Sequence, residues 1–141
     1  MPLVGGGGAG NVSGGNPSGT GTSINYVGNH AYAYSGVIEV SNSLVTLLDF
    51  SVGNSYIMAK FQPFYNDADQ GDNVAFEIKV DSELIYSIEL AGATTANTHR
   101  GDPNPIPILI PPYGRITVQG KNSTDSDTRN IGIVITGRVY A

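Results

Sequence analysis

The sequence predicts an all-β fold: an antiparallel β-sandwich of the jelly-roll type, preceded by an extended glycine-rich arm. From residue 31 onward, short runs alternate apolar and polar residues, which is strand periodicity. Gly, Pro, Asn, Asp and Ser gather between these runs, as they do in turns. No segment combines a helical apolar period with helix caps. About seven or eight strands are expected, and the long loop late in the chain favours a jelly-roll over an immunoglobulin topology.

Composition restricts the class of protein. The 141 residues form one domain, long enough to bury roughly two-thirds of the unfolded surface. Seven Lys and Arg stand against twelve Asp and Glu, and this net charge of −5 argues against nucleic-acid binding. Without Cys, neither a disulfide framework nor a thiolate metal site can form. No apolar run is long enough for a membrane span, and residues 1–4 lack the features of a signal peptide.

Residues 1–30 differ from the rest of the chain, since they contain no charged side chain and ten of the nineteen glycines. Such a segment buries too little apolar surface to offset its ordering entropy. It is either a flexible tail or an arm that lies extended along a partner. We expect an arm at 1–30 and the sandwich at 31–141. The candidate partner-binding side chains are Leu3, Val4, Val12, Ile24, Tyr26, Tyr32 and Tyr34.

Three glycines in the arm match a nucleotide-binding spacing. Gly5, Gly7 and Gly10 fit G-x-G-x-x-G. The dinucleotide fingerprint needs a strand before it and a helix after it. Only four residues precede Gly5, and an Asn- and Pro-containing run follows Gly10, so we reject the match. No cofactor is expected.

The first strands of the sandwich are predicted at 31–40, 44–50 and 56–65. The third of these should place Ile57, Ala59 and Phe61 on one face. Pro63 cannot donate to a ladder, so its end of the strand is expected at an edge or a bulge.

The central feature is a predicted hairpin over 74–90, with its turn at 81–83. Apolar and polar residues alternate on both sides of the turn, which gives one apolar and one charged face. An isolated hairpin is marginal in water, so its apolar face must be covered by the remaining strands. The apolar positions are Val74, Phe76, Ile78, Val80, Leu84, Tyr86, Ile88 and Leu90.

The last third of the chain is predicted as a long loop followed by three strands. Residues 91–105 form the loop, and 105–112 form an edge strand because prolines recur in it. A strand at 115–119 and a polar loop at 121–129 come next. The chain ends on an inward row of Ile131, Ile133, Ile135 and Val139, broken by Gly137.

An acidic loop at 66–72 is a candidate calcium site. Asp67, Asp69 and Asp72 offer hard oxygen ligands, but Gly71 and Ile78 stand where an EF-hand needs ligands. A solvated turn is the better interpretation, and Asp125 and Asp127 carry the same ambiguity. We therefore expect no metal to be required for folding.

Other motifs give no catalytic signature. Arg100-Gly101-Asp102 is the integrin-type adhesion tripeptide, in a loop expected to be exposed, and we interpret it as a turn. His30 and His99 are the two histidines, and no nucleophile elbow accompanies them. No catalytic residue is assigned, and the chain is not expected to be an enzyme.

The whole chain resembles small β-sandwich proteins of tailed-phage virions. The likeness is carried by the charge-free arm, the low charge, the lack of Cys, and residues 108–118 (ILIPPYGRITV), which read as an apolar strand, a proline pair and a second strand. The family includes capsid decoration, or cement, proteins. The resemblance implies a jelly-roll body, commonly trimeric, with an arm that reaches over neighbouring capsomers.

These observations favour a non-enzymatic virion protein that clamps major capsid subunits through its arm and sandwich base. It would be made in the host cytoplasm and would sit on the capsid surface as a homotrimer, without nucleic-acid or membrane partners. The alternative is a receptor- or carbohydrate-binding module of a head or tail fibre that uses loops 66–73 and 91–105. A small glycosidase is the third possibility, although the lack of Trp removes a common sugar-stacking platform.

Overall fold

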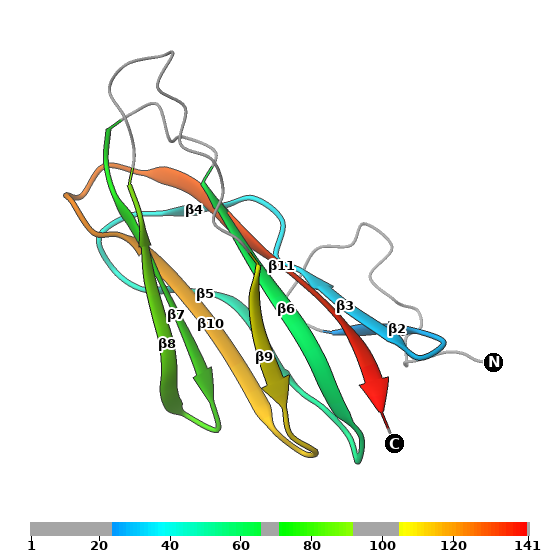
Figure 1. Cartoon of the computed structure of the whole chain (residues 1–141). Coiled ribbons are helices and arrows are strands. Elements are labelled where there is room, and N and C mark those ends of the chain that lie inside the picture. Colours follow the sequence, from blue (N-terminus) through cyan, green and yellow to red (C-terminus); the bar gives the residue numbers. More distant parts are fainter. Residues whose placement is uncertain (1–23, 66–70, 92–104, 141) are drawn as a thin grey trace.

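The protein is described by a computed structural model that places residues 24–65, 71–91 and 105–140. These residues form two antiparallel sheets that lie face to face (Figure 1). The four-stranded sheet has the order β5 (Val45–Ser51), β10 (Arg115–Asn122), β7 (Val74–Val80) and β8 (Glu83–Leu90). The six-stranded sheet has the order β2 (Asn25–Val27), β3 (His30–Tyr34), β11 (Arg129–Tyr140), β6 (Tyr56–Tyr65) and β9 (Ile106–Ile110). Its sixth strand, β4 (Ile38–Val40), pairs with the start of β11. The predicted all-β sandwich is confirmed.

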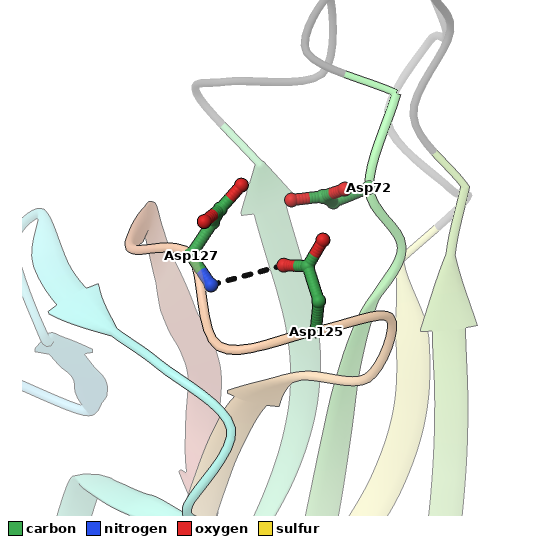
Figure 2. Close-up of side chains that lie close together, drawn as sticks. All are labelled: Asp72, Asp125 and Asp127. Atoms are coloured by element: carbon green, nitrogen blue, oxygen red, sulfur yellow. Dashed lines mark hydrogen bonds between the residues drawn. The ribbon is translucent and has the colours of Figure 1, made fainter.

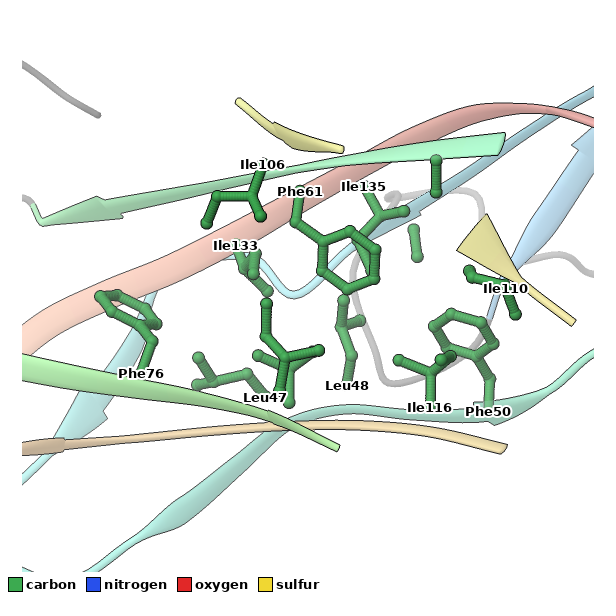
Figure 3. Close-up of a cluster of buried hydrophobic side chains, with 14 of the residues drawn as sticks. Leu47, Leu48, Phe50, Phe61, Phe76, Ile106, Ile110, Ile116, Ile133 and Ile135 are labelled. Carbon is green, nitrogen blue, oxygen red and sulfur yellow. The ribbon is translucent and has the colours of Figure 1, made fainter. Parts of the chain in front are cut away.

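The core lies between the inner faces of the two sheets, which both contribute large apolar side chains (Figure 3). Alternation along β6 buries Ile57, Ala59 and Phe61, as predicted. The inward row of β11 is confirmed for its three isoleucines, whereas Val139 is half-buried. Each large apolar side chain contributes about 1.5–3 kcal/mol through burial. The largest fully buried side chains include Phe61, Phe76, Leu47, Leu48, Ile57, Ile78, Ile110, Ile116, Ile131, Ile133 and Ile135.

Close packing of the two sheets requires a glycine at one inward position. Gly120 of β10 faces Ile131 of β11, and a Cβ at residue 120 would lie 2.5 Å from Cδ1 of Ile131. A larger side chain would have to displace a fully buried isoleucine. Gly120 therefore sets the local approach of the sheets.

A β-bulge explains why two consecutive leucines are buried in β5. Val118 pairs with Leu48, whereas Gln119 pairs with Thr46, so Leu47 is the extra residue. A bulge breaks the strict alternation of faces along a strand. Both Leu47 and Leu48 consequently enter the core.

The predicted strand at 31–40 is interrupted, and this corrects the sequence prediction. β3 ends at Tyr34 and β4 begins at Ile38, with Gly36 between them at a φ of 73°. The buried Ser35 hydroxyl accepts a 2.8 Å hydrogen bond from the Ile133 amide and donates one of 2.7 Å to the Gly36 carbonyl. The Ser35 hydroxyl thus satisfies the Ile133 amide at the interruption. β3 and β4 can therefore both pair with β11.

The hairpin of β7 and β8 exists as predicted, and its turn uses Asp81 and Ser82 at φ 52° and 71°. Two positive φ angles are typical of a type I′ turn. The predicted apolar face is wrong at Leu84, because a bulge between Ile78 and Lys79 pairs Leu84 with Lys79. Leu84, Ile85 and Tyr86 are exposed, since β8 is the edge of its sheet.

Other strand boundaries differ from the sequence prediction by a few residues. β10 runs on to Asn122, into the predicted loop at 121–129. β2 lies within the range 1–30 that the sequence assigns to the arm. Pro63 lies beyond Phe61, where pairing of β6 with β9 stops, so the predicted edge is found there.

Candidate functional site

Three carboxylates meet at one end of the sandwich. Asp72 lies just before β7, and Asp125 and Asp127 lie in the connection between β10 and β11. One carboxylate oxygen from each lies within 4.8 Å of the others (Figure 2). Oxygen ligands at this spacing suit a hard divalent cation. The cluster is therefore the candidate site of the described chain.

A guanidinium lies among these carboxylates. Nη2 of Arg129 lies 2.7 Å from Oδ2 of Asp72 and 3.5 Å from Oδ2 of Asp127. The Arg129 and Asp72 side chains are only 15% and 11% exposed. Burial by itself lowers the pKa of Arg129, but the negative field of Asp72, with Tyr65 and Asp127 adding to it, outweighs burial and raises this pKa. The charge of the cluster is thus partly neutralised from within the chain.

Asn122, the last residue of β10, organises the loop around the carboxylates. Its buried Nδ2 donates to Oδ2 of Asp72 at 3.2 Å, to Oδ1 of Asp125 at 3.2 Å and to the Asp127 carbonyl at 2.8 Å. Its Oδ1 accepts hydrogen bonds from the amides of Thr124, at 2.9 Å, and Asp125, at 3.3 Å. Asparagine favours such side-chain to backbone bonds at the start of a turn.

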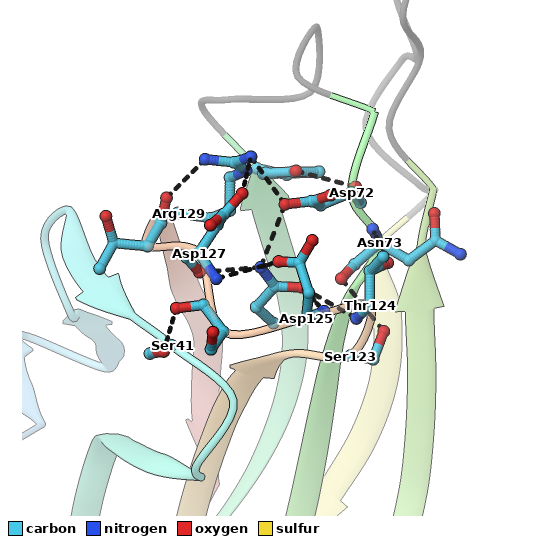
Figure 4. Close-up of polar contacts among 12 residues, drawn as sticks. Ser41, Asp72, Asn73, Ser123, Thr124, Asp125, Asp127 and Arg129 are labelled. Carbon is cyan, nitrogen blue, oxygen red and sulfur yellow. Dashed lines mark hydrogen bonds and ion pairs between the residues drawn. The ribbon is translucent and has the colours of Figure 1, made fainter.

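Further hydrogen bonds attach this loop to its neighbours (Figure 4). The Tyr65 hydroxyl at the end of β6 donates to the Asp72 carbonyl at 2.8 Å. The Asn73 amide donates to the Thr124 hydroxyl at 2.8 Å, and the Ser41 hydroxyl donates to the Ser126 carbonyl at 2.7 Å. Segments from both sheets are thereby joined at one end of the sandwich.

The arrangement is suited to holding strands together. Asp125 also accepts the Asp127 amide at 2.9 Å, so its carboxylate takes part in the loop's own structure. In the same loop the exposed Ser123 hydroxyl donates to the carboxylate of Glu89 at 2.5 Å and lies 3.1 Å from the Asn73 carbonyl, which attaches the loop to β8 and to the start of β7. Arg129 and the Asn122 amide already interact with the carboxylates that a cation would need. The chemistry of the site is that of a mostly buried ion pair between Asp72 and Arg129, bordered by the exposed carboxylates of Asp125 and Asp127.

The structure brings together only part of what the sequence singled out. Asp72, Asp125 and Asp127 form one cluster, although the sequence interpretation grouped Asp72 with Asp67 and Asp69. Those two residues lie outside the described residues, as do His99 and the tripeptide 100–102.

The candidate partner-binding residues have different environments. Ile24 is half-buried against the core, and Tyr26 is partly exposed in β2, where burial raises its pKa. Tyr32 and Tyr34 of β3 contact each other, with ring centroids 4.9 Å apart. Leu3, Val4 and Val12 lie outside the described residues.

Sequence reasoning missed Asn122 and Arg129 as site residues. Asn122 stands at the end of an alternating strand, and Arg129 precedes the last apolar row. These positions in the sequence do not indicate that the side chains of Asn122 and Arg129 approach Asp72, which lies fifty residues before Asn122. Only pairing of β10 with β7 predicts that contact, since Asn122 faces Val74 in the register.

None of the described segments forms a helix of the length and apolarity that a membrane span requires. No protein-family model matches the chain, and no curated protein is detectably similar to it.

Proposed function

We propose that this chain is a non-enzymatic structural protein of a virion, which decorates the capsid and clamps neighbouring major capsid subunits. The observation that carries the proposal is the combination of a sandwich with a continuous buried core and a preceding charge-free segment. Residues 1–23 contain no Asp, Glu, Lys or Arg. The described chain begins beside β2, at the edge of the six-stranded sheet.

The strand order supports a jelly-roll as the sandwich type. One sheet carries β3 and β4 together, then β11, β6 and β9, and the other carries β5, β10, β7 and β8. Consecutive strands therefore alternate between the sheets in the middle of the chain, apart from the hairpin of β7 and β8. With β3 and β4 counted as one interrupted strand and the edge strand β2 set aside, these are eight strands in two four-stranded layers. That is the strand arrangement of a jelly-roll, which is common among viral capsid proteins. Fold by itself does not fix function.

The arm supplies the clamp in this proposal. Glycine permits close backbone approach, and an extended segment can add main-chain hydrogen bonds to a partner's sheet edge. Twenty-two residues at about 3.3 Å each reach roughly 70 Å, enough to cross onto a neighbouring subunit. Leu3, Val4 and Val12 would be the apolar anchors of this arm.

A homotrimer is the proposed assembly, and the β8 edge supports self-association. Leu84 and Ile85 are 55% and 46% exposed on a strand whose outer side has no partner among the described residues. Between this edge and β9 lies an open groove of about 520 Å³, lined by Ile85, Tyr86, Ile106 and Ile108. An apolar edge strand is a template for pairing with another chain. A second copy is therefore the proposed occupant.

The decisive experiment is reconstitution on particles stripped of this protein. A variant lacking residues 1–22 should keep nearly the same unfolding midpoint, because the described core begins at Ile24. It should bind the particles at least tenfold more weakly than the full chain. Full-strength binding by this variant would contradict the clamp and move the contact surface to the sandwich.

A second variant separates anchoring from tethering. Replacing Leu3, Val4 and Val12 together by Ser keeps the length and the glycines of the arm but removes these three apolar side chains. We expect this variant to lose most of the binding that the deletion loses. Wild-type binding by the triple variant would show that the arm only tethers the sandwich.

A further inference from the structure

The outer face of the six-stranded sheet carries a cationic, aromatic patch that the clamp does not use. In β11, Arg138 pairs with His30 of β3 on one side and with Met58 of β6 on the other. Two residues earlier in β11, Thr136 pairs with Tyr32 of β3 and with Lys60 of β6. Directly paired residues share a face of the sheet, so these six side chains form two adjacent rows. We call this set the Arg138–Lys60 patch; its strands lie side by side in Figure 1.

The two cations of the patch are close and have no ion-pair partner among the described residues. Lys60 lies diagonally across from Arg138, and diagonal neighbours on one face are about 7–8 Å apart. Both side chains are exposed. Arg138 lies over the ring of Tyr140 at 5.9 Å, a cation–π contact that leaves its hydrogen-bond donors available.

No carboxylate shares these two rows. Among the described residues on this face, the register places a carboxylate at Glu39, which pairs with Asn130. Asn130 lies six residues from Thr136 along β11, roughly 20 Å. The chain as a whole has a net charge of −5, so the local charge of the patch is opposite in sign to that of the chain. By charge, the patch fits an anionic ligand.

A depression lies at the centre of the patch. Its volume is about 450 Å³, and its lining includes His30, Tyr32, Lys60, Thr136 and Arg138. This is within the usual range of small-molecule sites and larger than a single carboxylate group needs. All five side chains can donate hydrogen bonds, and Arg and Lys can only donate. Such a lining favours a ligand rich in acceptor oxygens and carrying a negative charge.

Tyrosine pairs border the two rows at both ends. Tyr56 and Tyr140 are stacked, with ring centroids 5.2 Å apart, at one end. Tyr32 and Tyr34 lie 4.9 Å apart at the other. An aromatic body with a polar tip offers an apolar surface to the C–H face of a sugar and a hydroxyl to its oxygens. A sugar acid can pack its ring against these tyrosines, whereas a bare anion cannot, so the rings favour a sugar acid as the ligand.

We propose that the Arg138–Lys60 patch binds a carboxylate-bearing sugar, such as a hexuronic or sialic acid residue at the end of a larger glycan. Arg138 and Lys60 bind the carboxylate, Thr136 and Tyr32 bind ring hydroxyls, and a tyrosine face packs against the ring. The open shape of the depression allows the rest of the glycan to extend into solvent. This inference stands independently of the clamp.

Titration of the full-length protein tests the proposal by following backbone amide shifts in NMR spectra. The probes are D-glucuronate and N-acetylneuraminate, with D-glucose as the neutral analogue and acetate as the bare carboxylate. We expect saturable binding of at least one sugar acid, on the order of 1 mM for a ligand of this size. The shifts should centre on β3, β6 and β11. Glucose and acetate should bind at least tenfold more weakly.

Matched variants tie the binding to the patch. Arg138→Gln and Lys60→Gln should each weaken sugar-acid binding about tenfold, and the exposure of both side chains predicts an unchanged unfolding midpoint. Lys79→Gln removes a cation from β7 of the other sheet, whose Nζ donates to Gln119 at 3.2 Å, and should leave binding unchanged. If all three variants lost sugar-acid binding equally, the assignment of the binding site to this patch would be wrong.

Three further results would overturn the ligand class. The absence of saturation by either sugar acid at tens of millimolar would exclude such a ligand. Acetate binding as tightly as glucuronate would show that the ring is not recognised. A triglutamate peptide that binds more tightly than both sugar acids would indicate docking of an acidic protein surface instead.

Discussion

The guanidinium of Arg129 lies 2.7 Å from the carboxylate of Asp72, and this ion pair joins the start of β11 to the segment that enters β7. It therefore links the six-stranded sheet to the four-stranded sheet at the end where their connections gather. Asp127 and Asn122 complete the contact from the loop between β10 and β11. The stability of that end depends on these groups being present together.

Replacing Arg129 by Met should lower the free energy of unfolding by about 2–3 kcal/mol, because it leaves the mostly buried Asp72 without its counter-charge. Urea denaturation measures the change. Arg115→Met is the matched control, since Arg115 also contacts a carboxylate, Asp49, at 2.8 Å but is 58% exposed. Arg115→Met should lower the free energy of unfolding much less, because solvent screens exposed ion pairs. Similar losses in both variants would contradict a special role for the buried pair.

Removing divalent cations should leave the melting temperature nearly unchanged. The carboxylates of Asp72 and Asp127 already face Arg129, and those of Asp72 and Asp125 accept from Asn122. Melting is recorded in EDTA and again in millimolar calcium. A cation bound to the folded state alone would raise stability with its concentration. A drop of many degrees in EDTA that calcium reverses would show that the cluster is a metal site.

The carboxylate of Asp49 should titrate below its ordinary pKa of about 3.9. Hydrogen bonds from Arg115 at 2.9 and 2.8 Å are the main cause of the lowered pKa, and together with the positive charge of Arg115 they outweigh the opposing effect of burial. A depressed pKa in the folded state stabilises the fold above the unfolded value, and the contribution is lost as pH falls through the folded value. NMR titration of the carboxyl carbon measures it. Arg115→Gln should raise the pKa of Asp49 toward its ordinary value, and no change would contradict the assigned cause.

Phe61→Ala should destabilise the protein by about 3–5 kcal/mol, since it opens a cavity at a fully buried position between the sheets. Met58→Ala, three residues earlier on the outer face of the same strand, should have a small effect because Met58 is exposed. Thermal and urea unfolding of both variants give the comparison. A large loss for Met58→Ala would indicate that the outer face is covered in solution.

The chain should have the mass of three 14.7 kDa subunits in solution, and Ile85→Asp should reduce it to one. The substitution places a charge on the apolar edge of β8, which the trimer would bury. Val37→Asp is the control, because Val37 is an exposed apolar residue outside that edge. Light scattering at micromolar concentration measures the masses. A monomeric wild-type protein would exclude the trimer.

Local patterns in the sequence determined most of the strands. Alternation along β6 and β7 predicts their bounds and buried faces, because side chains of a strand point alternately to the two sides of a sheet. The turn at Asp81 and Ser82 follows from the short reversal between two alternating runs. These features depend on neighbouring residues, so the sequence contains the information directly.

Tertiary structure decided the exceptions and the site. The interruption at Ser35 depends on the amide of Ile133, and the exposure of Leu84 depends on a bulge opposite Lys79. The carboxylate cluster likewise depends on strand order, since pairing of β10 with β7 brings Asn122 and its loop to Asp72 across fifty residues. Charge and alternation can be read along the chain, but contacts of this range arise only when the sheets pair, because the pairing register sets which distant side chains meet.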